Sequence, residues 1–340
     1  MTQPRTASRR PARKAAKRAT AAAPARAPKR SRARAAPETR GKTEQQTHGD
    51  QQPHGNQKPH VDHKPHVKHD PQVDFNPHVD HNPYDAREHR APSLALMALE
   101  WRAPLEFSFT LGSLPLLYRA PSGDGHSVLV FPGLIAGDVS TLPLRGYLKS
   151  RGYDVEGWLQ GLNLGPRPGV LERSEEQVRQ IARDTGRKLS LIGWSLGGIY
   201  AREIAKQLPE CVRCVITLGT PFTGHPRSTN AWRLYEMASG HKIETHPKRG
   251  RLHEAPPVPT TSIYSRTDGV VAWECSVQDA HASAHGEVEN IEVVASHLGL
   301  GMNPAALYAI ADRLAQPEGL WAPFHRQGWR SMVYPESGDR

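Results

Sequence analysis

The chain has 340 residues, enough for one or two domains, and a formal net charge of +10. Residues 1–42 hold ten Arg, four Lys and one Glu, so the positive charge belongs to a terminal segment and the remainder is slightly acidic. Three cysteines exclude a disulfide framework, and no apolar run approaches the length of a membrane span.

Residues 1–50 are rich in Ala, Arg and Pro and contain almost no large apolar side chain. Such a segment cannot bury enough surface to offset the entropy of ordering, so we expect a disordered tail. No apolar segment follows Arg9 and Arg10, which predicts no secretory signal and a cytoplasmic protein. The charge of residues 1–42 favours weak, nonspecific binding to nucleic acid or an anionic surface, with a solubilising leader as the alternative.

Residues 51–90 repeat a proline every six residues, as in Lys58–His63 and Lys64–His69. Regular prolines exclude a helix and a central strand, so the repeat predicts an extended linker. Nine of the eighteen histidines fall between His48 and His89. Histidine-rich tracts can chelate transition metals, but a flexible tract has no fixed ligand geometry, and we expect no metal site and no cofactor.

Residues 91–330 have the composition of a globular domain, and 331–340 are expected to be a C-terminal tail. Apolar runs that indicate strands alternate with segments of helical period, so the sequence predicts an α/β fold with a mostly parallel sheet covered on both faces. The expected strands are 127–131, 153–158, 189–192, 212–218, 261–265 and 291–294, and the expected helices are 142–149, 170–185, 198–206 and 303–315.

Ser195 lies in Gly193-Trp194-Ser195-Leu196-Gly197, between an apolar run and a helical segment. A strand, a glycine-flanked serine and a helix are the context of a nucleophile elbow, a turn so tight that a side chain at either glycine would clash. The serine hydroxyl is then exposed above the sheet edge beside a helix N-terminus, where negative charge is favoured.

A serine hydroxyl needs a base to activate it, and the base needs an acid to orient it. In an open parallel sheet these groups should follow the carboxyl ends of strands. Asp268 comes three residues after 261–265 and His297 three residues after 291–294, so both occupy the expected kind of position. Asp279 and His285 are the alternatives for the two roles.

Residues 125–316 resemble the α/β-hydrolases of the bacterial lipase and esterase type. The matching pieces, in the order of that family, are Phe131-Pro132-Gly133-Leu134, Gly193–Gly198, Leu218-Gly219-Thr220-Pro221-Phe222, Thr267–Val271 and Ser296–Leu300. The resemblance implies a Ser195–His297–Asp268 catalytic triad and an oxyanion hole formed by the backbone N–H groups of Leu134 and Leu196.

The function that follows is hydrolysis of carboxylic esters through an acyl-enzyme, acting on a small-molecule or lipid ester. The interval between Leu218 and Pro259 allows only a small or minimal cap, and Phe222, Trp232 and Tyr235 are candidates for contacts with the substrate. An acyltransferase on the same fold and a noncatalytic scaffold held to polyanions by its basic tail are the alternatives.

Overall fold

The computed structural model describes residues 89–239, 251–279 and 287–336. The chain divides into two compact units, residues 1–73 and 74–340, and all the described residues belong to the second. The expected basic tail and histidine-rich linker therefore lie outside the described residues, apart from His89 and Arg90 at the end of the linker.

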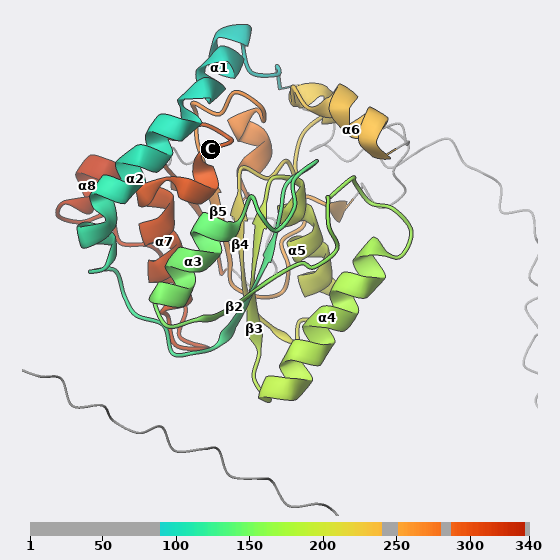
Figure 1. Cartoon of the computed structure of the whole chain (residues 1–340), viewed down its shortest axis with the longest axis vertical. Helices are drawn as coiled ribbons and strands as arrows, with labels where there is room; N and C mark the ends of the chain where they lie inside the picture. Colours follow the sequence, from blue (N-terminus) through green and yellow to red (C-terminus); the bar gives the residue numbers. More distant parts are fainter. Residues whose placement is uncertain (1–88, 240–250, 280–286, 337–340) are drawn as a thin grey trace, which may run out of the picture. The chain divides into compact units, whose positions relative to one another are not determined.

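The second unit is built around a six-stranded parallel sheet with the strand order β2-β1-β3-β4-β5-β6 (Figure 1). The strands are β1 Ser127–Phe131, β2 Asp154–Gly157, β3 Leu189–Trp194, β4 Val212–Leu218, β5 Thr260–Tyr264 and β6 Val288–Glu292. The chain starts in the interior of the sheet at β1, pairs β2 on one side and then builds outward on the other side. This doubly covered α/β architecture is the fold class that the sequence predicts.

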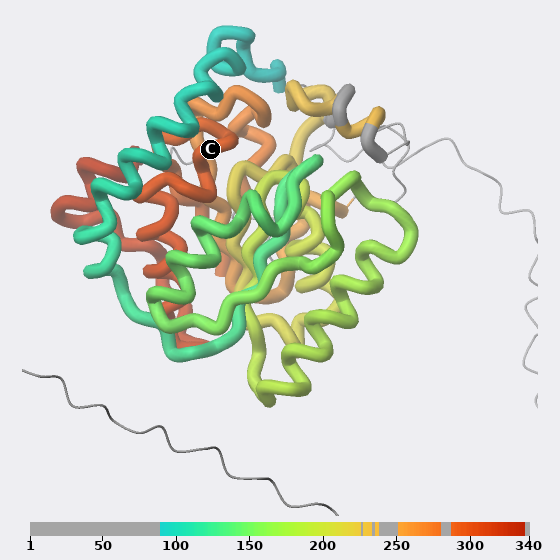
Figure 2. Tube along the Cα trace, in the orientation of Figure 1, coloured from blue at the N-terminus to red at the C-terminus, as the bar shows by residue number. Residues whose placement is uncertain are grey.

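Helices cover both faces of the sheet because side chains of a strand point alternately to the two sides. The covering helices are α3 Leu142–Ser150, α4 Val170–Thr185, α5 Leu196–Gln207 and α7 Pro304–Leu314 (Figures 1 and 2). Val128 and Val130 of β1 pack in one core cluster with residues of α3 and α7, whereas Leu129 and Phe131 pack in another with residues of α4 and α5. The short α6, Trp232–Ser239, follows β4.

The N-terminal side of the domain contains a helical segment that the sequence analysis does not predict. It comprises α1 Leu94–Ala98, the 3-10 turn η1 Leu99–Arg102 and α2 Ala103–Leu117, and α2 packs along α7 (Figure 1). Its apolar residues occur all around the helix, so no amphipathic period marks it as a surface helix.

Two expected boundaries are wrong. The last strand covers 288–292 instead of 291–294, because its first half is polar and pairs at the sheet edge, where Asn290 donates from its amide to the Gln278 carbonyl. Residues 331–336 are part of the packed domain instead of a tail, since Tyr334 is fully buried and its hydroxyl donates to the Ala305 carbonyl. α8, Arg330–Val333, delivers Tyr334 to this position.

No helix within the described ranges is both long and apolar enough to cross a bilayer.

Candidate active site

Ser195 stands at a sharp turn between β3 and α5. Its backbone has φ 52° and ψ −122°, a conformation that is costly for a residue with a side chain and that clusters at functional sites. A Cβ atom at Gly193 would overlap Gly198, and one at Gly197 would overlap the carbonyl of Phe131. The close approach of these backbones requires glycine at both positions, as the elbow context predicts.

The structure brings Ser195, His297 and Asp268 together. His297 Nε2 lies 3.0 Å from Ser195 Oγ, and His297 Nδ1 lies 2.7 Å from Asp268 Oδ2. The three side chains come from loops that follow β3, β6 and β5, so residues about 100 positions apart in sequence meet at one edge of the sheet. His297 and Asp268 are both buried, which removes competing water from their hydrogen bond.

The Asp268 carboxylate is held by backbone N–H groups of the loop that follows it. Its second oxygen, Oδ1, accepts hydrogen bonds from the N–H groups of Val270 and Val271, both at 2.8 Å. These bonds orient Oδ2 toward the imidazole. Of the two alternatives, His285 lies outside the described residues, and Asp268 is the carboxylate that bonds to His297.

Burial alone would lower the pKa of His297, but the charge of Asp268, its hydrogen bond and the charge of Glu100 outweigh burial and raise the pKa above its ordinary value. The imidazolium that would form on proton transfer is therefore stabilised. The carbonyl of His297 also accepts a hydrogen bond from the Trp194 indole at 3.1 Å, which holds the histidine loop beside the elbow.

Glu100, on η1, is a site residue that the sequence reasoning missed. This carboxylate is only 6% exposed and accepts three backbone hydrogen bonds. Oε1 accepts from Gly269 at 2.7 Å and from His297 at 2.9 Å, while Oε2 accepts from Leu298 at 2.9 Å. One side chain thus ties the acid loop to the histidine loop. It lies 169 residues before Gly269 and 197 before His297, so no local motif reveals it.

Two further charges of the N-terminal helical segment reinforce this connection. Arg102 donates to the carbonyl and hydroxyl oxygens of Thr267, next to the acid. Glu106 accepts from the Ser296 N–H at 2.8 Å, next to the histidine, and pairs with Arg102. All three charged side chains of residues 94–117 therefore contact the loops that carry Asp268 and His297.

Asn163 fixes the loop after β1, which carries Leu134. Its carbonyl accepts from the Ile135 N–H at 2.7 Å, its N–H donates to the Ala136 carbonyl at 2.8 Å, and its side-chain amide donates to the Pro132 carbonyl at 2.8 Å. Ile135 has φ 56°, so the loop turns sharply directly after Leu134. Asn163 is fully buried and is a second positioning residue that the sequence reasoning missed.

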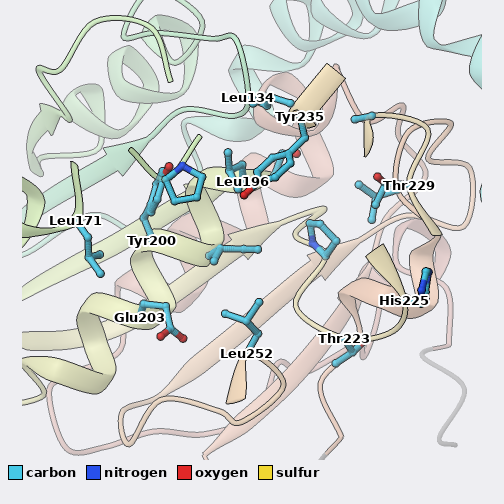
Figure 3. Close-up of a pocket in the computed structure, with 16 residues that line it drawn as sticks. Leu134, Leu171, Leu196, Tyr200, Glu203, Thr223, His225, Thr229, Tyr235 and Leu252 are labelled. Carbon is cyan, nitrogen blue, oxygen red and sulfur yellow. The ribbon is translucent and has the colours of Figure 1, made fainter. Parts of the chain in front are cut away.

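A cavity of about 160 Å³ opens in front of Ser195. Leu134, Leu196 and Tyr235 line it, together with mostly apolar side chains such as Ile199 and Val271 (Figure 3). Glu203 is a charged exception on its wall, and its carboxylate accepts from Lys206 at 2.8 Å. The cavity therefore suits an uncharged, apolar group next to the serine.

The three candidate substrate contacts have different positions. Tyr235 lines the cavity, whereas Phe222 and Trp232 do not belong to its lining. Phe222 is buried under the guanidinium of Arg202, 3.9 Å from the ring centre, and Trp232 lies beside the guanidinium of Arg227.

The strand order, the strained serine between β3 and α5, and the order serine, acid, histidine in the loops after β3, β5 and β6 identify the architecture. The chain has an α/β-hydrolase fold.

Solved structures of several hydrolases are similar to this chain. Lipase B of Aspergillus fumigatus is 19% identical with a TM-score of 0.47, over 58% of this chain and 54% of that one. Monoacylglycerol lipase of Paleococcus ferrophilus is 16% identical with a TM-score of 0.41, over 56% and 96%. The pyrethroid hydrolase PytH is 19% identical with a TM-score of 0.40, over 55% and 96%.

The chain spans about half the length of the Aspergillus lipase. No family model matches the sequence, and no curated protein matches it.

A second serine, histidine and aspartate also meet within this α/β-hydrolase fold. His126 Nε2 lies 2.8 Å from Ser190 Oγ, and His126 Nδ1 lies 2.5 Å from Asp124. Ser190 is fully buried within β3, near its amino end, and does not line the cavity at Ser195. Burial lowers the pKa of His126 despite its bond to Asp124. We therefore interpret this set as a structural network without access for a substrate.

In the described parts of the chain, no group of three or more His, Cys, Asp or Glu side chains is arranged to hold a metal ion. The histidine-rich repeat lies outside those parts, except for His89.

Proposed function

We propose that the chain is a serine hydrolase that cleaves carboxylic esters through an acyl-enzyme on Ser195. The observation that carries the proposal is the 3.0 Å separation of His297 Nε2 and Ser195 Oγ at the base of a largely apolar cavity. A serine activated by an oriented imidazole is a nucleophile suited to acyl transfer.

In the first step, His297 Nε2 accepts the Ser195 proton as Oγ attacks the ester carbonyl carbon. The carbonyl π electrons move to oxygen, and the tetrahedral oxyanion that results would be held by the backbone N–H groups of Leu134 and Leu196. Each such donor contributes on the order of 3 kcal/mol to transition-state stabilisation. Leu196 is the first residue of α5, so the helix N-terminus adds a favourable potential for the negative charge.

The tetrahedral intermediate then collapses. The bond to the alkoxy oxygen breaks, His297 donates its proton to the departing alcohol, and the acyl group remains on Ser195. Water attacks the acyl carbon as His297 accepts a proton from it. The bond from the acyl carbon to Ser195 Oγ then breaks as His297 returns that proton to Oγ, and the carboxylic acid leaves. Throughout this cycle Asp268 Oδ2 accepts the hydrogen bond from His297 Nδ1–H, so that Nε2 faces the serine.

The lining of the cavity indicates which kind of ester fits it. Leu171, Ile199 and Val271 offer an apolar wall to the acyl or alkyl portion, and Tyr235 of α6 lies over the same space (Figure 3). Neutral apolar esters fit this lining better than charged ones, because a buried charge would lack a partner.

The test is turnover of p-nitrophenyl esters by the wild type, by Ser195→Ala and by Ser190→Ala. The proposal predicts that Ser195→Ala loses ester turnover to background while Ser190→Ala retains it, with both variants folded by circular dichroism. Full activity of Ser195→Ala would contradict the proposal. So would a result in which Ser190→Ala is folded but inactive while Ser195→Ala remains active.

A further inference from the structure

The helical segment of residues 93–118 has an inverted distribution of polarity. Its charged side chains are Glu100, Arg102 and Glu106, and all three bond to the loops of the catalytic edge. The side chains on the outer face are apolar or uncharged. The large exposed ones are Leu94, Met97, Leu99, Trp101, Leu105, Phe109, Leu111, Leu116 and Tyr118.

Three of the most exposed side chains are evenly spaced in the sequence. Leu105 and Phe109 are four residues apart in α2, which places them on one face of that helix, and they are 72% and 73% exposed. Trp101, four residues before Leu105 in η1, is 87% exposed. We call the outward side of residues 94–118 the outer apolar face. A soluble monomer rarely exposes so many large apolar side chains together, so this face requires an occupant.

Positive charge borders this face. The exposed residues from Ser93 to Tyr118 include no charged side chain, but Arg90 precedes them and Arg119 follows them, and both are exposed. Upstream of Arg90 the chain continues for 89 residues, and residues 1–42 contribute a net charge of +13. Apolar side chains flanked by Arg and Lys are typical of segments that lie in the interface of an anionic membrane.

Other occupants fit less well. Residues 1–88 are polar and charged with few large apolar side chains, so they offer little to bury this face. A second copy of the chain would bring the same Arg90 and Arg119 together around a shared interface, along with two strongly basic segments. An anionic bilayer would bury the apolar side chains and attract the basic residues that flank them.

We propose that the outer apolar face docks the protein on an anionic lipid surface, with residues 1–42 adding electrostatic attraction. The segment lies on the membrane and does not span it, because Glu100, Arg102 and Glu106 hold its other side against the catalytic loops. Docking would therefore place the catalytic edge beside the lipid. The proposal does not depend on the reaction proposed for Ser195.

The test uses the full chain and vesicles of phosphatidylcholine, with or without phosphatidylglycerol, in a flotation assay at low and moderate salt. The variant Leu105→Ser/Phe109→Ser removes two exposed side chains that the folded monomer does not bury. The matched control is Leu320→Ser/Met332→Ser, which removes two apolar side chains of similar exposure that lie outside residues 94–118, in the C-terminal part of the sequence.

We expect the wild type and the control to bind anionic vesicles more tightly than neutral ones, and Leu105→Ser/Phe109→Ser to bind them at least about tenfold more weakly. Turnover of a short water-soluble ester should be the same in all three proteins.

Three results would overturn the proposal: no vesicle binding by the wild type, equal binding by both double variants, or a wild-type dimer that Leu105→Ser/Phe109→Ser dissociates. Equal binding with strong salt dependence would assign lipid attraction to the basic segment alone.

Discussion

Glu100→Gln is the substitution that best tests whether Glu100 positions His297 or only fills space between the two loops. The amide is nearly the same size as the carboxylate and can keep its oxygen at Oε1, where Gly269 and His297 donate. Its NH₂ group then faces the Leu298 N–H, which loses its acceptor. The variant also removes a negative charge that raises the pKa of His297.

The expected loss of stability in Glu100→Gln follows from these contacts. A buried donor without a partner costs about 1–3 kcal/mol, and each of the two charge-assisted bonds that becomes neutral loses about 0.5 kcal/mol. We therefore expect the free energy of unfolding to fall by roughly 2–4 kcal/mol, which leaves a protein with an ordinary stability folded. Looser placement of His297 should lower kcat by about tenfold with a small change in KM, since a misplaced base affects the transition state most.

The pH dependence of kcat/KM distinguishes the two roles of Glu100, because a purely structural role would leave it unchanged. His297 must be neutral to act as base, so kcat/KM declines as the pH drops through its pKa, which lies above the ordinary 6.5 in the wild type. Loss of the Glu100 charge moves this acidic limb to lower pH.

The control is Glu106→Gln. This carboxylate accepts from the neighbouring Ser296 N–H, whereas the charges that raise the pKa of His297 are those of Asp268 and Glu100. Profiles measured with p-nitrophenyl acetate, with urea unfolding of each protein, test the reasoning. An unmoved limb in Glu100→Gln, or an equal shift in Glu106→Gln, would refute it.

Two further predictions concern the acid and the N-terminal residues. Asp268→Asn should lower kcat by about 10³ to 10⁴, because the amide favours the wrong imidazole tautomer, and should also move the acidic limb to lower pH. Asp279→Asn is the matched control, and a larger loss in that variant would show that the acid is misassigned. A chain shortened to begin at His89 should retain ester hydrolysis, since the Ser228 hydroxyl donates to the His89 carbonyl and every proposed catalytic group lies later. Loss of activity in that folded, shortened chain would contradict this expectation.

The elbow and its partners could be predicted from sequence because each is local. The glycines beside Ser195 act on backbone atoms within a few residues, and Asp268 and His297 each follow a recognisable strand. The central strands could be predicted equally well, because a strand that is buried on both faces is a continuous apolar run in the sequence.

The N-terminal helical segment could not be predicted, because its pattern contradicts the usual rule for surface helices. Its charged side chains bond to backbone and hydroxyl groups far along the chain, and many of its large apolar side chains are exposed. The function of Glu100 depends on loops about 170 and 200 positions later, so only the tertiary structure reveals it. The polar residues in the first half of β6 hid only the start of that strand, because an edge strand needs less apolar surface.

The most direct test of the account is to identify the serine that reacts with a fluorophosphonate probe. The full-length wild type, Ser195→Ala and Ser190→Ala are treated with the probe, and the modified peptide is located by mass spectrometry. The strained turn, the adjacent His297 and the open cavity predict a single adduct on Ser195, present in Ser190→Ala and absent from Ser195→Ala. An adduct on Ser190, or undiminished labelling of Ser195→Ala, would contradict the proposed active site.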